Sequence, residues 1–252
     1  MKPISRRKLI TGGLATTAGL VGVGAAATLI RRAGLVPPDC RGPYGPGETL
    51  TYAAQRILTR HSMAREFSRD MISKTPFANE IAPPTDLFKA HQEKGFSDWR
   101  LTVGGMVARP GSFSLSDLKS MPMRSQITEV ACEEGWSYIA EWIGTPLYEV
   151  LHEVGPLSEA KYLAYFSTDP NWWESIDLTD AMHPQTCLTW GMNDGDLPVP
   201  FGGPLRMRIP RQLGYKSVKF ITHIELADTL KGLGKRLGYI EQDYAYSWYA
   251  GM

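Results

Sequence analysis

Apolar residues recur along the chain with two different spacings, which predict short strands interspersed with short helices. The alternation of Trp99, Leu101 and Val103 is typical of a strand. Helical spacing is clearest in residues 143–155, where the predicted helix ends at Gly155. Neither spacing repeats in a regular strand–helix–strand order, so the pattern indicates a mixed α+β fold.

Other segments carry weaker forms of the same patterns. A patchy helical period in residues 49–71 predicts one or two short helices, whereas the prolines of residues 73–86 indicate an irregular loop. On the strand predicted to follow Gly203, Arg206 and Arg208 share one face, which is either solvated or binds a ligand. The predicted strands later in the chain cover residues 124–136, 160–168, 202–210 and 215–228.

Three stretches of different composition divide the chain. Residues 1–35 contain a twin arginine, Arg6-Arg7, and an uncharged run rich in Gly, Ala and Thr, which predicts a twin-arginine export signal and a periplasmic protein. Residues 36–48 are rich in proline and glycine and predict a linker, and residues 49–252 are expected to form a single domain. The uncharged run is also long enough to span a bilayer, so an uncleaved leader would keep the protein at the membrane.

The balance of charge and the cysteine content exclude several classes of partner and cofactor. Lys and Arg total 27 and Asp and Glu total 26, so no nucleic-acid surface is predicted. The three cysteines, Cys40, Cys132 and Cys187, are odd in number and widely spaced. This spacing argues against a disulfide framework and against a zinc or iron–sulfur site built from cysteines.

Five motifs in a fixed order carry a family resemblance. They are "CEEGW", "TPLYEVL", "DAMHPQT", "GDLPVPFGGPLRMRIP" and "QLGYKSVKFITHIEL", and they lie between residues 132 and 226. In this order the chain resembles the molybdopterin-binding domain of the sulfite oxidase family. The nearest likeness is to its single-domain periplasmic branch, which includes the catalytic subunit of the periplasmic methionine sulfoxide reductase. The resemblance implies a single mixed α+β domain that binds Mo-molybdopterin.

The resemblance implies a specific role for Cys132. This residue would be the catalytic thiolate bound to molybdenum, while the other sulfur ligands would come from the pterin dithiolene. A soft, anionic sulfur ligand suits a high-valent metal whose other ligands are also sulfur. Without the flanking motifs, a lone cysteine after a strand would be interpreted as a buried core residue, which is the alternative.

Further cofactor contacts follow from the matching motifs. Arg206 and the segment 217–219 are implied to bind the pterin phosphate, and Ser167 or Thr168 supplies one hydroxyl near the metal. The full set of implied cofactor-binding residues is Asn79, Glu80, Ser167, Thr168, Arg206, Ser217, Val218 and Lys219.

Some positions depart from the family pattern or have an open role. Phe201 stands where relatives carry His or Asn, and its side chain cannot form that hydrogen bond to the pterin. His183 matches a family position but also fits a structural residue at a helix end. Four tryptophans are candidates for the substrate funnel or the core: Trp136, Trp142, Trp172 and Trp173.

A molybdenum centre of this family implies oxygen-atom transfer. Glu133 and Glu134 follow the cysteine directly, which favours a neutral oxide such as a sulfoxide over the sulfite anion. Sulfite oxidation by the same centre is one alternative. The other is a non-catalytic exported pterin-binding subunit, which Phe201 would favour.

The expected electron donor is another protein. The sequence lacks CxxCH, so no haem is predicted to be attached covalently. The resemblance implies a membrane haem protein or a soluble periplasmic carrier as the redox partner. It also implies a C-terminal dimerisation domain for which this sequence has no room, so a monomer or a loose heterocomplex is expected.

Overall fold

The computed structural model of the chain describes residues 28, 30, 33–38, 45–79, 82–83, 85–234 and 246–252. They fall into two compact units, one ending at Leu58 and one beginning at Thr59. In the first unit, helix α2 (Gly45–Ala54) is followed by a π-helical turn, η1 (Gln55–Thr59). The predicted export signal lies almost entirely outside the described residues, and its boundaries stay predictions. Within the described residues, no helix has the length and apolar character needed to cross a membrane.

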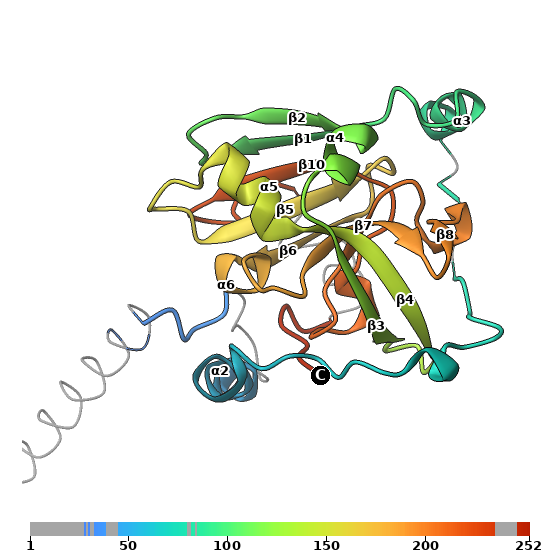
Figure 1. Cartoon of the computed structure of the whole chain (residues 1–252). Coiled ribbons are helices and arrows are strands. Elements are labelled where there is room, and N and C mark those ends of the chain that lie inside the picture. Colours follow the sequence, from blue (N-terminus) through green and yellow to red (C-terminus); the bar gives the residue numbers. More distant parts are fainter. Residues whose placement is uncertain are drawn as a thin grey trace, which may run out of the picture. The chain divides into compact units, whose positions relative to one another are not determined.

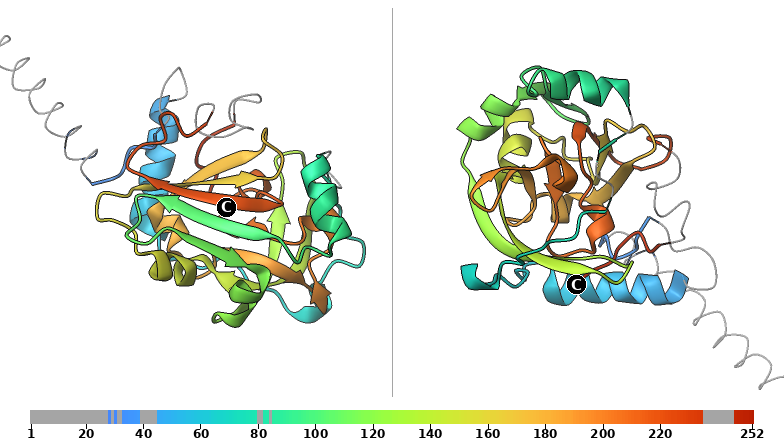
Figure 2. Two further views of the ribbon diagram at one scale, coloured as in Figure 1. Left: turned by 90° about the horizontal axis from the view of Figure 1, so that it is seen from above. Right: turned by 90° about the vertical axis from the view of Figure 1, so that its right-hand side faces the viewer.

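The first of two five-stranded sheets in the second unit has the strand order β2-β1-β10-β5-β6. Figures 1 and 2 show β10 lying between β1 and β5. β1 and β10 run parallel, and at their end Gly105 has a φ of +77° and approaches Leu226 so closely that a Cβ would lie 2.2 Å from its carbonyl oxygen. The strands are β1 (Arg100–Gly105), β2 (Gly111–Ser114), β5 (Tyr162–Ser167), β6 (Trp173–Asp177) and β10 (Ile221–Ala227).

The second sheet has the order β3-β4-β7-β8, with β9 paired to β7. All of its pairs are antiparallel. β3 and β4 form a long hairpin whose turn is residues 132–136. The strands are β3 (Arg124–Ala131), β4 (Ser137–Pro146), β7 (Cys187–Met192), β8 (Gly195–Asp196) and β9 (Arg206–Arg208).

The main hydrophobic core joins both sheets and helix α5. α5 buries Leu147 and Leu151 completely, and burial of each such side chain stabilises the fold by about 1.5–3 kcal/mol. Leu101 of the first sheet and Met207 of the second belong to the same core, so the α+β domain has one continuous interior. The helices and 3-10 turns are η2 (Arg69–Met71), α3 (Asp86–Glu93), α4 (Leu115–Ser120), α5 (Leu147–Val154), α6 (Leu178–Ala181), η3 (Val199–Phe201) and η4 (Gly214–Lys216).

Two elements differ from the sequence prediction for reasons of packing. The helix predicted over residues 143–155 begins at Leu147, because residues 143–146 continue strand β4. The helical period predicted to reach residue 71 gives way to an extended segment. There, the backbone N–H of Phe67 donates to the carbonyl of Ile127 on β3 at 2.9 Å. Pairing with the sheet therefore outweighs the weak local helical preference.

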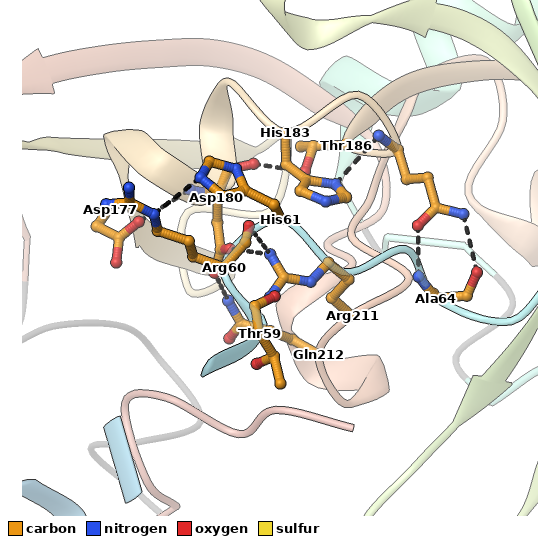
Figure 3. Close-up of polar contacts among 11 residues, drawn as sticks. Thr59, Arg60, His61, Ala64, Asp177, Asp180, His183, Thr186, Arg211 and Gln212 are labelled. Atoms are coloured by element: carbon orange, nitrogen blue, oxygen red, sulfur yellow. Dashed lines mark hydrogen bonds and ion pairs between the residues drawn. The ribbon is translucent and has the colours of Figure 1, made fainter. Parts of the chain in front are cut away.

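A buried polar cluster holds the start of the second unit in place, as Figure 3 shows. Arg211 donates to the carbonyls of Thr59 at 2.6 Å and Arg60 at 3.1 Å. Its guanidinium also pairs with Asp180 at 3.2 Å, and Gln212 donates to the other oxygen of that carboxylate at 2.5 Å. These partners offset the cost of burying the two charges, so the cluster has a structural role.

His183 lies beside this cluster and outside the cavity described below. Its Nδ1 accepts a hydrogen bond from the backbone N–H of Gln185 at 3.2 Å. Burial, with the nearby charge of Arg211, lowers the pKa of His183 to about 4. The folded protein therefore keeps this imidazole neutral at pH values where an unfolded histidine is protonated.

The depressed pKa of His183 predicts a loss of stability in acid. As the pH falls from about 6.5 to about 4, the unfolded chain takes up a proton that the folded chain does not, so unfolding becomes easier. In His183→Gln the difference in unfolding free energy between pH 7 and pH 4 should shrink by roughly 3 kcal/mol. Urea unfolding at both pH values measures this, with His152→Gln on an exposed face of α5 as the control. An unchanged difference in the variant would contradict the assignment.

Candidate functional site

A cavity lies where the β3–β4 turn meets the β5–β6 and β9–β10 connections. Of Cys132 and the implied cofactor-binding residues, those lining the cavity are Asn79, Cys132, Ser167, Arg206, Ser217, Val218 and Lys219. Also in the wall are Pro83, Glu133, Glu134, Trp136, Asp169, Trp172, Gly214, Tyr215 and Phe220.

Cys132 is the first residue after β3 and forms the base of the hairpin turn. Its N–H donates to the carbonyl of Trp136 at 2.9 Å, and its own carbonyl accepts from the N–H of Gly135 at 3.0 Å. Gly135 has a φ of +91°, which favours glycine. Gly214 closes the other side, where a Cβ would lie 3.7 Å from the Cα of Cys132. The turn thus holds the thiol at a fixed place in the cavity wall.

Two carboxylates accompany the thiol. The Sγ of Cys132 lies 3.7 Å from Oε2 of Glu134, and this oxygen accepts a hydrogen bond from Nε1 of Trp136 at 2.7 Å. Burial, with the negative charges of Glu133 and Glu134, raises the pKa of the Cys132 thiol to about 12. The thiol is therefore protonated at neutral pH, and a metal cation bound there would replace its proton.

Arg206 connects the two loops beside β9. It is 4% exposed, and its Nε donates to the carbonyl of Ser217 at 3.1 Å while Nη1 donates to the carbonyl of Phe201 at 2.9 Å. Nη2 has no hydrogen-bond partner among the described residues. Since Arg206 lines the cavity, one face of a buried cation remains available to an anionic ligand.

The arginine face of β9 is buried, so the possibility that it is solvated is wrong. Arg208 is 0% exposed and donates to the carbonyl of Glu129 and, at 3.3 Å, to Oγ of Ser217. Both guanidinium groups lie 5.3 Å from the ring centre of Trp142, which stabilises them by cation–π attraction. Burial, with the nearby charge of Arg206, lowers the pKa of Arg208 to about 9. Arg208 does not line the cavity, and its bonds connect β9 to β3.

The two candidate hydroxyls occupy different positions. Ser167 lines the cavity, and its Oγ accepts from the N–H of Asp169 at 3.2 Å. Thr168 lies next to the lining residues, and its buried Oγ1 has no hydrogen-bond partner in the described part of the chain. A buried hydroxyl left unpaired costs about 1–3 kcal/mol. A ligand that supplies a partner would remove that cost.

The remaining candidates divide between the cavity, the core and the undescribed residues. Asn79 lies in the cavity wall, and Glu80 lies outside the described residues, so its role stays a prediction. Phe201 packs edge-on against Tyr138 at 5.8 Å, so its side chain belongs to a smaller hydrophobic cluster while its carbonyl holds Arg206. Of the four tryptophans, those in the cavity wall are Trp136 and Trp172, and those buried in the core are Trp142 and Trp173.

Sequence reasoning did not place Asp169, Gly214 or Tyr215 in the site. Asp169 shapes the β5–β6 turn, where its Oδ1 accepts from the N–H of Asn171 at 2.9 Å. The signal that could have found it is the turn sequence Asp-Pro-Asn directly after a strand that carries Ser167.

The cavity residues fit the expected molybdopterin. A soft sulfur lies in the wall at Cys132, and the buried guanidinium of Arg206 has donor capacity for a phosphate. The polar side chains of Asn79, Ser167 and Ser217 in the cavity wall suit a ligand rich in donors and acceptors. In the described part of the chain, no three His, Cys, Asp or Glu side chains are grouped as metal ligands.

Comparisons with known proteins agree with this chemistry. Residues 89–232 match the family described as "Oxidoreductase molybdopterin binding domain". The chain is 35% identical over 205 residues to the protein-methionine-sulfoxide reductase catalytic subunit of Xanthomonas axonopodis pv. citri, covering 75% of this chain and 63% of that protein. It is 34% identical over 186 residues to the subunit of the same name in Ralstonia nicotianae, covering 68% and 52%. The chain thus spans less than two thirds of the length of these relatives.

A solved structure shows the same fold. The sulfane dehydrogenase SoxCD from Paracoccus pantotrophus aligns with a TM-score of 0.51 at 21% identity, covering 68% of this chain and 46% of that one. This likeness concerns the fold alone. The family match covers more than half of the sequence and includes the cavity wall from Cys132 to Phe220. The chain therefore belongs to the oxidoreductase molybdopterin-binding domain family, the sulfite oxidase family.

Proposed function

We propose that the chain uses Mo-molybdopterin to reduce a neutral sulfoxide-type substrate by oxygen-atom transfer, with electrons from another protein. The observation that carries the choice of substrate is the pair of carboxylates, Glu133 and Glu134, in the cavity wall beside Cys132. Fixed negative charge beside the reacting centre repels an anion such as sulfite and leaves a neutral oxide unaffected. The names of the relatives, protein-methionine-sulfoxide reductase catalytic subunits, support the same class.

The proposal also assigns a role to the two cationic side chains of the cavity, Arg206 and Lys219. Arg206 donates to two loop carbonyls, and Lys219 donates through Nζ to the carbonyl of Pro200 at 2.7 Å. Both side chains are tied to the loops around β9, where the family's pterin phosphate is expected. We assign them to the cofactor and not to the substrate.

When bound, molybdopterin supplies the two-electron oxygen-atom transfer chemistry. Cys132 gives up its thiol proton and provides the protein sulfur ligand. Trp136 and Trp172 provide aromatic walls that exclude water from part of the cavity. Trp136 also fixes the carboxylate of Glu134 through its indole N–H at 2.7 Å, so the charge beside the thiol keeps one position.

The proposal also includes a cellular setting. The twin arginine at Arg6-Arg7 supports export of the folded, cofactor-loaded chain to the periplasm. Its electrons would come from a membrane haem protein or a periplasmic carrier, and an uncleaved leader would keep it at the membrane. Fractionation of cells that express the full chain tests the location.

A substrate panel tests the proposed reaction. With an artificial electron donor, the purified protein should reduce methionine sulfoxide and dimethyl sulfoxide. With an artificial electron acceptor in place of the donor, it should oxidise sulfite poorly. Glu134→Gln removes one charge beside the thiol, so the ratio of sulfite to sulfoxide kcat/KM should rise about ten-fold. Glu153→Gln makes the same charge change on an exposed face of α5 and should leave the ratio unchanged. Turnover of sulfite alone by the unmodified protein would refute the proposal.

A further inference from the structure

Most of the cofactor loop, defined here as residues 213–219, lines the cavity, but Lys216 does not. Tyr215 and Ser217 line the cavity, whereas Lys216 between them is completely buried in the protein interior. A lysine is rarely buried unless its charge is paired. The position of this side chain therefore has a specific cause.

Lys216 is held by a set of polar contacts on the far side of the loop. Its Nζ pairs with Oε2 of Glu174 at 2.7 Å and donates to the carbonyl of Ser175 at 3.2 Å. The hydroxyl of Tyr165 donates to the backbone carbonyl of Lys216 at 2.7 Å. Both the side chain and the backbone of the loop are thus fixed to strands β5 and β6.

Aromatic rings cover the buried ammonium group. Its Nζ lies 5.5 Å from the ring centre of Tyr215 and 5.4 Å from that of Trp248. Trp248 donates through its indole N–H to Oγ of Ser175 at 2.9 Å, so this ring is itself held on β6. The ammonium group of Lys216 is therefore enclosed by other parts of the protein.

The ion pair is poorly suited to a purely stabilising role. Lys216 and Glu174 are both 0% exposed, and Oε1 of Glu174 has no hydrogen-bond partner among the described residues. A buried pair of this kind is commonly no more stabilising than apolar side chains of similar volume. The pair instead restricts the conformation of the loop, because a buried charged group has few positions in which it keeps its partners.

We propose that Lys216 and Glu174 are positioning residues, which hold the cofactor loop in the conformation that binds molybdopterin. The proposal rests on the cofactor assigned under the proposed function. Arg206 and Arg208 of β9 each hydrogen-bond Ser217, and the ion pair with Glu174 on β6 holds the neighbouring residue, Lys216. The loop is thereby held at two adjacent residues, Lys216 and Ser217.

A double variant that removes both charges tests the role. Lys216→Met/Glu174→Gln leaves no unpaired buried charge and keeps both side chains near their original size. In the full chain produced with its cofactor, we expect molybdopterin to be lost about ten-fold faster during dialysis, as the fluorescence of released, oxidised pterin reports. Amide hydrogen exchange of residues 213–219 in the cofactor-free protein should also quicken about ten-fold, while exchange in β3 and α5 stays unchanged.

Two further variants make the outcome decisive. Lys119→Met/Asp196→Asn removes an exposed ion pair of the same N–O distance, 2.7 Å, and should change neither rate. Tyr165→Phe removes the hydroxyl that donates to the carbonyl of Lys216 and should raise both rates about three-fold. This milder variant decides the question if the double variant does not fold.

The possible failures are distinguishable. If the double variant lost molybdopterin and exchanged its loop amides at the same rates as the unmodified protein, the positioning role would be overturned. If the unmodified protein carried no molybdopterin, the proposed function would fail, and loop exchange in the cofactor-free chains would still decide whether the ion pair sets the loop.

Discussion

Cys132→Ser should lose turnover of sulfoxide by roughly a thousand-fold or more. A serine hydroxyl is harder than a thiolate and stays protonated, so it is a poor substitute in a sulfur-rich metal site. The change removes little volume from the cavity wall, and the two backbone hydrogen bonds of the turn remain possible. The measurement is kcat with an artificial donor, normalised to the molybdenum and pterin content.

Cys187 provides the matched control. It is fully buried in β7 and is absent from the cavity wall. Cys187→Ser should lower stability because it places a hydroxyl in the core, but turnover per bound molybdenum should stay the same. Full activity of Cys132→Ser would show that its sulfur is not the protein ligand.

Arg206→Met should lower the amount of bound molybdopterin by roughly a hundred-fold. The variant removes the buried cation of the cavity and leaves the carbonyls of Ser217 and Phe201 without their donor. Each unsatisfied carbonyl costs about 1–3 kcal/mol, so the unfolding temperature should fall as well. Pterin content after purification, together with thermal unfolding, separates the two effects.

The control for this variant is Arg109→Met. Arg109 also donates to a backbone carbonyl, that of Glu153, but it lies at the exposed surface away from the cavity. This variant should keep its cofactor and lose little stability. Equal cofactor loss in both variants would argue that arginine removal acts through general destabilisation.

Several parts of the fold could be predicted because local sequence determines them. Helix α5 has a continuous apolar face and ends at Gly155, whose φ of +67° is the left-handed conformation that its sequence predicts. The strand predicted over residues 124–136 is β3, whose alternating burial matches its alternating sequence, but it ends at Ala131, and Cys132 lies in the turn that follows. Most cavity residues that the sequence singled out belong to motifs whose order was characteristic of the family.

The parts that could not be predicted depend on distant contacts. β4 is buried on both faces over much of its length, so its sequence does not alternate and gives no strand signal. On β9, alternation predicted two faces, yet carbonyls and the ring of Trp142 make both faces interior. Asp169 and Gly214 reach the cavity from connections that meet only in the folded chain.

The parallel pairing of β1 with β10 has a consequence for biosynthesis. Thr102 and Thr222, which meet across this pair, are 120 residues apart in sequence. The centre of the first sheet cannot close on the ribosome until β10, ending at Ala227, has emerged, and such long-range closure is slow. The wall of the cavity between β9 and β10 also forms late. Cofactor insertion is therefore a step that follows translation of the chain through β10.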